Sequence, residues 1–419
     1  MLIDTPMITA YPPRTAKPRF LRCIAPILAA LLMLAGCGTT TVKSTTFTHL
    51  EQETAVIPES QLLDLGVIPF DPGLDEADED EMVRPEVRNA ESRYFASQLV
   101  ATLQNSGAWG PVRVIPGVDT VVDVYVEGTI LHSDGEKLEL AIVATDASGK
   151  QWLNKTYEEV ASVYAYDKRR TQNRDPFQGL FNRIANDLRQ QRDMLPAGRA
   201  EELRTVSQLR FARSFAPDAY DRHIRENRKG ELEIVRLPAS NDPIMQRIER
   251  IRERDYLFVD TLQEHYDTFK RQMDPPYQSW RAESYEEVIA ARQLKKQSTA
   301  RMVGGIAAVA GGILAATSSN SATQVGGIMA AGAGGMLIKS SLEKRQEAQM
   351  HIEALAELGE SLEVAIEPRV IELEDRTITL TGNAEAQYAQ WKALLQQIYD
   401  AERGIDAGQG PAAPIEQVQ

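Results

Sequence analysis

The chain has 419 residues, 25% of them charged and 43% hydrophobic, which is enough for two or three domains with buried cores. Its formal net charge of −14 disfavours nucleic acid as a partner, because phosphate binding needs a basic face. The two cysteines both lie within the first 37 residues, so the rest of the chain offers no thiol for a disulfide, a redox couple or a metal site.

The first 36 residues have the pattern of a secretory signal peptide. Four basic residues precede an apolar run over residues 24–34, and small residues lie directly before Cys37. About a dozen apolar residues are too few to cross a bilayer. Leu34-Ala35-Gly36-Cys37 resembles the bacterial lipobox, which implies cleavage before Cys37 and lipid attached to it. Removal of this basic signal leaves a mature chain of net charge −17.

The residues after Cys37 indicate the membrane to which the protein is sorted and predict a linker. Gly38 follows the cysteine, where an Asp usually means retention in the inner membrane. The resemblance therefore implies an outer-membrane protein that contacts membrane lipid through Cys37 and faces the periplasm. The polar composition that follows predicts a flexible tether over residues 37–60.

Residues 61–165 are expected to form a small α+β domain. Residues 62–70 form a candidate strand in which Pro69 favours an edge or terminal position. An acidic run over residues 75–81 fits a solvated loop or a loose cation site. Pro85 opens a helix that Gly107 should end. Four strands are then predicted over residues 112–115, 121–131, 137–145 and 151–160, ending in a meander.

Two short motifs in this domain carry a family resemblance. Gly66-Val67-Ile68-Pro69-Phe70 and Val122-Asp123-Val124-Tyr125-Val126-Glu127-Gly128 resemble the amino-terminal domain of TolB, the curli-secretion lipoprotein and the lipoprotein activators of penicillin-binding proteins. The resemblance implies a sheet-and-helix module that binds a protein partner. Its motifs contain no catalytic residue. Any small α+β domain would show the same order of strands and helix.

Residues 170–300 are predicted to be largely helical. Apolar stripes indicate helices over residues 177–188, 200–215 and 244–273, and Pro275-Pro276 is expected to break the third one before a further helix. Charges of both signs lie between the apolar positions, which favours exposed helices. A helical bundle and a coiled-coil-like arm both fit this pattern.

Residues 301–340 form a glycine-rich apolar segment in two halves, with a polar turn at residues 318–321. Several glycines are seven residues apart, which places them on one helix face where another helix can approach closely. The candidate oligomerisation or membrane-contact residues are Gly304, Gly305, Gly311, Gly312, Gly326, Gly327, Gly334 and Gly335.

The glycine-rich segment has two interpretations. Each half has about 15 residues, short of the roughly 20 that span a bilayer, but a helical hairpin could enter one leaflet. Basic residues flank both ends, which favours contact with anionic head groups: Arg292, Lys295, Lys296, Arg301, Lys339, Lys344 and Arg345. The alternative is a hairpin buried inside a folded domain.

Residues 342–403 are predicted to form a second small α+β unit, and residues 404–419 a disordered tail. A helix over residues 342–358 precedes candidate strands at residues 364–366, 370–373 and 377–381. Asn383 is a good N-cap for an amphipathic last helix. This unit is a candidate second docking surface.

The sequence contains no motif that specifies a reaction. His49, His132, His223, His265 and His351 are scattered, and none has a second histidine ligand four residues away. No catalytic, cofactor or metal site is therefore predicted. The expected function is a non-enzymatic periplasmic protein-binding or scaffold lipoprotein, with a possible homo-oligomer. The alternatives are a subunit of an outer-membrane secretion or export assembly, and a cell-wall hydrolase.

Overall fold

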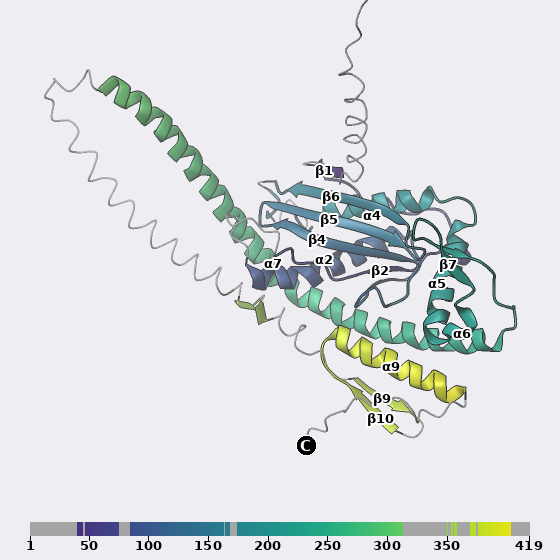
Figure 1. Ribbon diagram of the computed structural model, residues 1–419. Helices are drawn as coiled ribbons and strands as arrows, with labels where there is room; N and C mark the ends of the chain where they lie inside the picture. The colour runs from purple at the N-terminus through teal and green to yellow at the C-terminus, as the bar shows by residue number, and fades with distance from the viewer. Residues whose placement is uncertain are drawn as a thin grey trace, which may run out of the picture. The chain divides into compact units, whose positions relative to one another are not determined.

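The computed structural model describes residues 40–44, 47–74, 84–162, 164–167, 174–312, 350, 353–354, 356–357, 369–373 and 376–403. Residues Thr41–Gln419 fall into one compact unit. Helices and strands alternate irregularly along it, which gives the predicted α+β fold (Figure 1). The strands are β1 (Thr40–Ser44), β2 (Leu65–Val67), β3 (Val112–Val114), β4 (Val124–Ser133), β5 (Lys137–Asp146), β6 (Gln151–Val160), β7 (Ile224–Glu226), β8 (Leu232–Ile234), β9 (Arg369–Leu373) and β10 (Arg376–Leu380). The helices are η1 (Glu59–Gln61), α2 (Pro85–Ser106), α4 (Gln178–Asp193), α5 (Arg199–Phe215), α6 (Pro217–Tyr220), α7 (Pro243–Gly312) and α9 (Ala384–Glu402).

A six-stranded mixed sheet in the order β1-β6-β5-β4-β2-β3 forms the centre of the fold. Strand β2 is parallel to both of its neighbours, whereas β4, β5 and β6 form the predicted antiparallel meander. The strand expected over residues 62–70 is shorter, and Pro69 lies beyond its end. Strand β2 lies between β4 and β3, so it is not an edge strand. Of the two positions predicted for Pro69, an edge strand or the end of a strand, the second is therefore the correct one.

The helix α2 connects β2 to β3 and has the predicted limits. Pro85 occupies its first turn, where the missing N–H would have no partner in any case. Gly107 ends it in the left-handed conformation with φ of 66°. The acidic run at residues 75–81 lies outside the described residues, so its interpretation stays a prediction.

One face of the sheet is covered by helices α2 and α4. Along β5, alternate side chains are buried, and the buried set includes the predicted Leu138, Leu140 and Ile142. Phe95 of α2 and Phe181 of α4 meet above this face, with ring centroids 5.9 Å apart. The core continues without interruption into the helices that follow, so the segments predicted as residues 61–165 and 170–300 share one core.

The longest helix, α7, corrects the prediction of a break at Pro275-Pro276. It contains both prolines and continues to Gly312. A proline inside a helix loses a hydrogen bond and strains the preceding turn, so contacts elsewhere must hold it. Residues on both sides of the pair supply them: Asp274 accepts a hydrogen bond from Tyr94 of α2, and Tyr277 donates one to Glu91. Propensity predicted an end to the helix, and tertiary packing overrides it.

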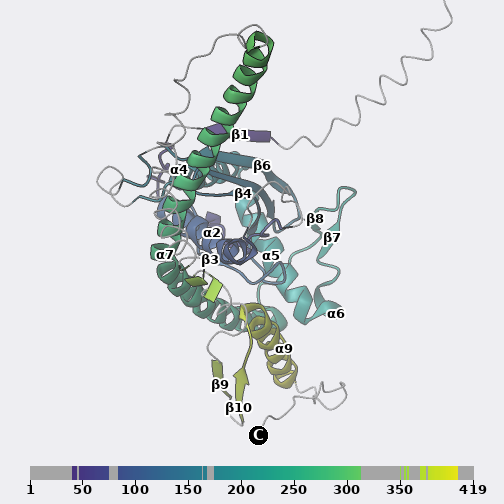
Figure 2. The same cartoon turned by 90° about the vertical axis from the view of Figure 1, so that its left-hand side faces the viewer.

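The predicted C-terminal unit is present in its described part. Strands β9 and β10 pair antiparallel, and the Asn383 side chain accepts the amide N–H of Ala386 at the start of α9. Helix α9 lies against α7 (Figure 2), where Trp391 stacks on Phe258 with ring centroids 4.9 Å apart. Residues 364–366 and most of residues 342–358 lie outside the described residues.

Candidate functional site

Residues 47–61, here called the strap, run along helix α4. The Asn182 and Asn186 side chains donate hydrogen bonds to the backbone oxygens of Thr48 and His49, both within 2.9 Å. The amide of Glu51 donates to Asn186 Oδ1 at 2.9 Å. At residues 48–51 this differs from the flexible tether expected for residues 37–60, because side chains of α4 fix a stretch of backbone that forms no helix or strand.

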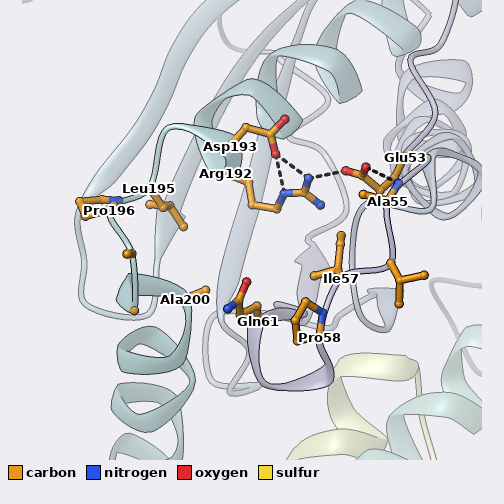
Figure 3. Close-up of a pocket in the computed structure, with 13 residues that line it drawn as sticks. Glu53, Ala55, Ile57, Pro58, Gln61, Arg192, Asp193, Leu195, Pro196 and Ala200 are labelled. Carbon is orange, nitrogen blue, oxygen red and sulfur yellow. Dashed lines mark hydrogen bonds and ion pairs between the residues drawn. The ribbon is translucent and has the colours of Figure 1, made fainter.

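A pocket of about 440 Å³ opens between the end of the strap and the turn from α4 to α5 (Figure 3). Arg192 lies at its wall and donates to Glu53 at 2.7 Å and to Asp193. Arg192 also donates to the backbone oxygen of Ala108, which ties the pocket wall to the end of α2. The remaining lining is mostly apolar: Ala55, Val56, Ile57, Pro58, Leu195 and Pro196.

The charged side chains in this pocket are paired with one another. The hydrogen bond from Arg192, together with that from the Ala55 amide, lowers the pKa of Glu53 to about 2. A carboxyl with this pKa is ionised at neutral pH, so it has no proton to donate, and it is only a weak base. Val56, which is 97% exposed, and the exposed Pro58 and Pro196 give this pocket, called the strap pocket below, an apolar lip.

A second pocket, of about 360 Å³, is polar and lies between α5 and α7. Asp123 is buried at its base, where its carboxylate accepts from Ser207 and from the backbone N–H of Asp64. Burial raises the pKa of Asp123. Because Ser207 belongs to α5 and Asp64 precedes β2, this carboxylate joins a helix to the sheet.

A buried polar cluster fixes α7 to the rest of the fold. Arg281 is fully buried and donates from Nη1 to Asp175 Oδ2 at 2.8 Å. Its guanidinium also lies over the ring of Tyr277, 4.1 Å from the centroid. Tyr277 donates to Glu91 of α2 at 2.5 Å, and burial raises the pKa of that carboxyl. Arg281, Asp175, Tyr277 and Glu91 are called the Arg281 cluster below.

The same part of α7 packs directly on the turn between β4 and β5. A Cβ atom at Gly135 would collide with the backbone of Arg281 and Tyr285. The Gly135 carbonyl oxygen accepts from Tyr166, and its amide donates to Ser284 at 3.2 Å. Glycine is therefore required here for close approach of two backbones. Neither this contact nor the Arg281 cluster was predicted, because charges inside a helix pattern indicated a solvated face.

The structure describes only some of the predicted site residues. Gly304, Gly305, Gly311 and Gly312 lie within α7, so the expected boundary at residues 300–301 falls inside a continuous helix. The other predicted positions lie outside the described residues: Cys37, Gly326, Gly327, Gly334 and Gly335. Among the described helices, none combines the length and apolar character needed to cross a bilayer. Insertion and burial of the glycine-rich segment therefore both stay predictions.

The described histidines lie apart and serve local contacts. His49 packs edge-on against Phe47 in the strap, His132 pairs with Asp134 at 2.9 Å, and a ring nitrogen of His223 contacts the Arg236 carbonyl oxygen. His265 lies on α7, and His351 lies outside the described residues. In the part of the chain that the structure describes, no three His, Cys, Asp or Glu residues gather into a group that could hold a metal ion.

Comparison with known proteins found no matching family model, no matching curated protein and no matching solved structure. The resemblance to the TolB-like and curli-secretion domains therefore stays a prediction from two short motifs.

Proposed function

We propose that this protein is a non-enzymatic outer-membrane lipoprotein that acts as a protein-binding or scaffold component in the periplasm. Cys37 carries the lipid, and the glycine-rich segment provides self-association or membrane contact. The observation that carries the proposal is the lipobox pattern directly ahead of a fixed strap. Phe47, ten residues after Cys37, already belongs to the packed chain, so a lipid at Cys37 would hold the folded unit close to the membrane.

The strap pocket supports a binding role for the folded unit. Its apolar lip is exposed, and its one arginine is already neutralised by Glu53 and Asp193, an arrangement that suits an apolar segment of a protein partner. The sheet-and-helix module over residues 61–165 would also bind a protein partner, as its family resemblance implies. Both surfaces lie on a scaffold held rigid by one continuous core.

Extraction of membranes with detergent, followed by measurement of particle size, tests the proposal. The parent carries Cys37→Ala, and the variant also has Gly304, Gly311, Gly327 and Gly334 changed to Leu. We expect the unlipidated parent to pellet with membranes or to run as a defined oligomer, and the Leu variant to do neither. If the parent is a soluble monomer, the glycine-rich segment does not attach the protein to membranes, and the lipid on Cys37 is its only anchor. A stable ring would favour the export-assembly alternative.

Lipidation itself needs a separate measurement. We expect the mature amino terminus of the intact chain to carry acyl chains by mass spectrometry and that of Cys37→Ala to carry none when both are expressed with the full signal. A mass for the mature amino terminus that lacks acyl chains would overturn the proposed anchor. Ser44→Ala serves as a matched control, because it changes another small polar residue in the same segment and leaves the lipobox intact.

A further inference from the structure

Strands β7 and β8 form a hairpin (Figure 2), and this hairpin lies beside the turn between β5 and β6. The Leu232 amide of β8 donates to the Ser148 carbonyl oxygen in that turn at 2.7 Å. A Cβ atom at Gly149 would lie 3.5 Å from the Gly230 carbonyl oxygen, so the two turns are in contact. The side chains of Leu232 and Ile234 pack against the core. These contacts hold the hairpin in place on the fold.

The outer edge of β8 carries backbone groups that point away from β7. Val235 donates to the His223 carbonyl oxygen at 2.8 Å, so the Val235 amide faces the β7 side of the hairpin. Because the pairing direction alternates along an antiparallel strand, the N–H and C=O groups of Leu232 and Ile234 point outward. Ser148 accepts from Leu232, but among the described residues none bonds to the amide or the carbonyl oxygen of Ile234.

The edge strand β3 differs, because side chains close it. Gln263 of α7 accepts the Val114 amide at 2.6 Å, and Gln104 of α2 donates to the Val112 carbonyl oxygen at 2.9 Å. Cover of this kind keeps an edge strand from pairing with another chain. The outer edge of β8 instead faces a pocket of about 470 Å³, which the hairpin lines together with residues of α5 and of the turn before it.

The side chains around this pocket leave positive charge for a partner. Its three carboxylates have partners of their own: Glu202 with Arg199, and Glu231 and Glu233 with Asn227. Among the described residues, none bonds to the ammonium group of Lys150 or of Lys229, and both lysines are exposed. They come from the two touching turns, in a chain whose net charge is −14. The pocket therefore favours an acidic partner.

From these contacts we infer that the outer edge of β8 binds an extended, acidic segment of a protein partner, which adds to the hairpin as a third strand. An extended backbone carries the N–H and C=O groups that match those of Ile234. Val235 and Leu237, 51% and 65% exposed, continue the chain after Ile234 and suit apolar residues that alternate with the acidic ones. The inference rests on the proposed protein-binding role and adds the chemistry of the partner.

Titration with two peptides tests the inference. The first is Glu-Val-Glu-Val-Glu-Val-Glu, blocked at both ends, and the second has Lys in place of each Glu. The full chain carrying Cys37→Ala is used in detergent, and amide hydrogen exchange is resolved to single residues. We expect the acidic peptide to slow exchange at Ile234 by roughly tenfold at saturation, while the Glu233 amide, already bonded to β7, changes little. Equal effects of both peptides, or no slowing at Ile234, overturn the inference.

Charge reversal at the two turns provides an independent test. Lys150→Glu combined with Lys229→Glu should weaken binding of the acidic peptide by roughly tenfold, because repulsion replaces attraction at both turns. The matched control, Lys270→Glu combined with Arg271→Glu on α7, makes the same change in net charge and should bind as the parent does. Equal losses in the two variants contradict a defined docking site.

A modified peptide tests the backbone pairing itself. The acidic peptide methylated at every amide nitrogen keeps its carboxylates but cannot donate to a strand edge. We expect it to leave exchange at Ile234 unchanged. If it binds as tightly as the unmodified peptide does, the carboxylates alone account for binding, and addition of a strand is excluded.

Failure of this inference and failure of the proposed function give different results. The mass of the amino terminus and the extraction of membranes test the lipid anchor and the membrane contact, and the peptide titration depends on neither. Acylated protein that binds neither peptide overturns the inference and leaves the proposed lipoprotein scaffold standing. Protein without acyl chains that binds the acidic peptide at Ile234 supports the inference and contradicts the proposed anchor.

Discussion

Arg281 and Asp175 form a buried ion pair at 2.8 Å although they are 106 residues apart in the sequence. The pair connects α7 to the segment before α4, and Tyr277 extends the same contact to Glu91 of α2. Among the residues that the structure describes, none is a hydrogen-bond partner of the Arg281 guanidinium nitrogens Nε and Nη2. The carboxylate of Asp175 is therefore the principal compensation for burying this charge.

Changing Arg281 to Met should destabilise the protein by about 3–5 kcal/mol, because it leaves Asp175 buried without its partner. Urea unfolding followed by tryptophan fluorescence measures the change, since Trp280 stacks on Tyr277 in the same turn. The double variant with Asp175→Asn should recover much of the loss. Arg271→Met, at an exposed position of the same helix, is the control and should have little effect.

Gly135→Ala should displace α7 from the turn between β4 and β5, because the added methyl group would overlap its backbone. We expect a loss of about 1–3 kcal/mol in unfolding free energy and faster hydrogen exchange in residues 277–290. Gly117→Ala is the matched control, because a Cβ atom there would meet nothing within 4 Å. Equal exchange in the two variants would contradict the close contact.

The stability of the fold should depend on the protonation of Glu159. Burial raises the pKa of this carboxyl to about 7 in the folded state, despite the guanidinium of Arg183 at 3.3 Å. The folded state then binds more protons than the unfolded state between pH 4.5 and 7. Stability from this group is present below pH 4.5 and is lost as the pH rises through 7.

The Glu159→Gln variant tests this dependence. Its stability should equal that of the wild type near pH 4.5 and exceed it by about 1–2 kcal/mol at pH 8, after allowance for solvent screening. Urea midpoints across this range provide the measurement. Glu233→Gln, in exposed strand β8, should leave the wild-type slope unchanged. A Gln variant with the slope of the wild type would rule out Glu159 as its origin.

Removing Asn186 should release the strap without unfolding the protein. Its side chain holds the Glu51 amide and the His49 carbonyl oxygen, so Asn186→Ala should increase hydrogen exchange at residues 47–53. The loss in global stability should stay near 1 kcal/mol. Gln190→Ala, at an exposed position of the same helix, should leave that exchange unchanged. Slow exchange in both variants would show that other contacts hold the strap.

Local signals predicted most of the described elements. Pro85 and Gly107 marked the ends of α2, the alternation over residues 137–145 placed the buried face of β5, and Asn383 marked the start of α9. Each of these features depends on the backbone preference or hydrophobic period of a few consecutive residues, which a sequence displays directly. The α+β class followed from their order.

Contacts between residues far apart in the chain could not be predicted from the sequence. Arg281 lies in a helix whose mixed charges predict a solvated face, yet it is buried beside Asp175, which comes from another segment. Glu91 of α2 is also buried, and its partner Tyr277 comes from α7. Pro275 and Pro276 predict a helix end, yet packing against α2 carries α7 past them. The strap has a polar sequence typical of a tether, and contacts with distant side chains, among them Asn182 and Asn186 of α4, fix it.

The sequence by itself determined the lipobox-like pattern before Cys37, the glycine spacing and the limits of the local elements, because each is encoded in neighbouring residues. Only the tertiary structure decided where the strap begins relative to α7. Asp175, Phe47 and Arg281 are far apart along the chain, and no local preference relates them.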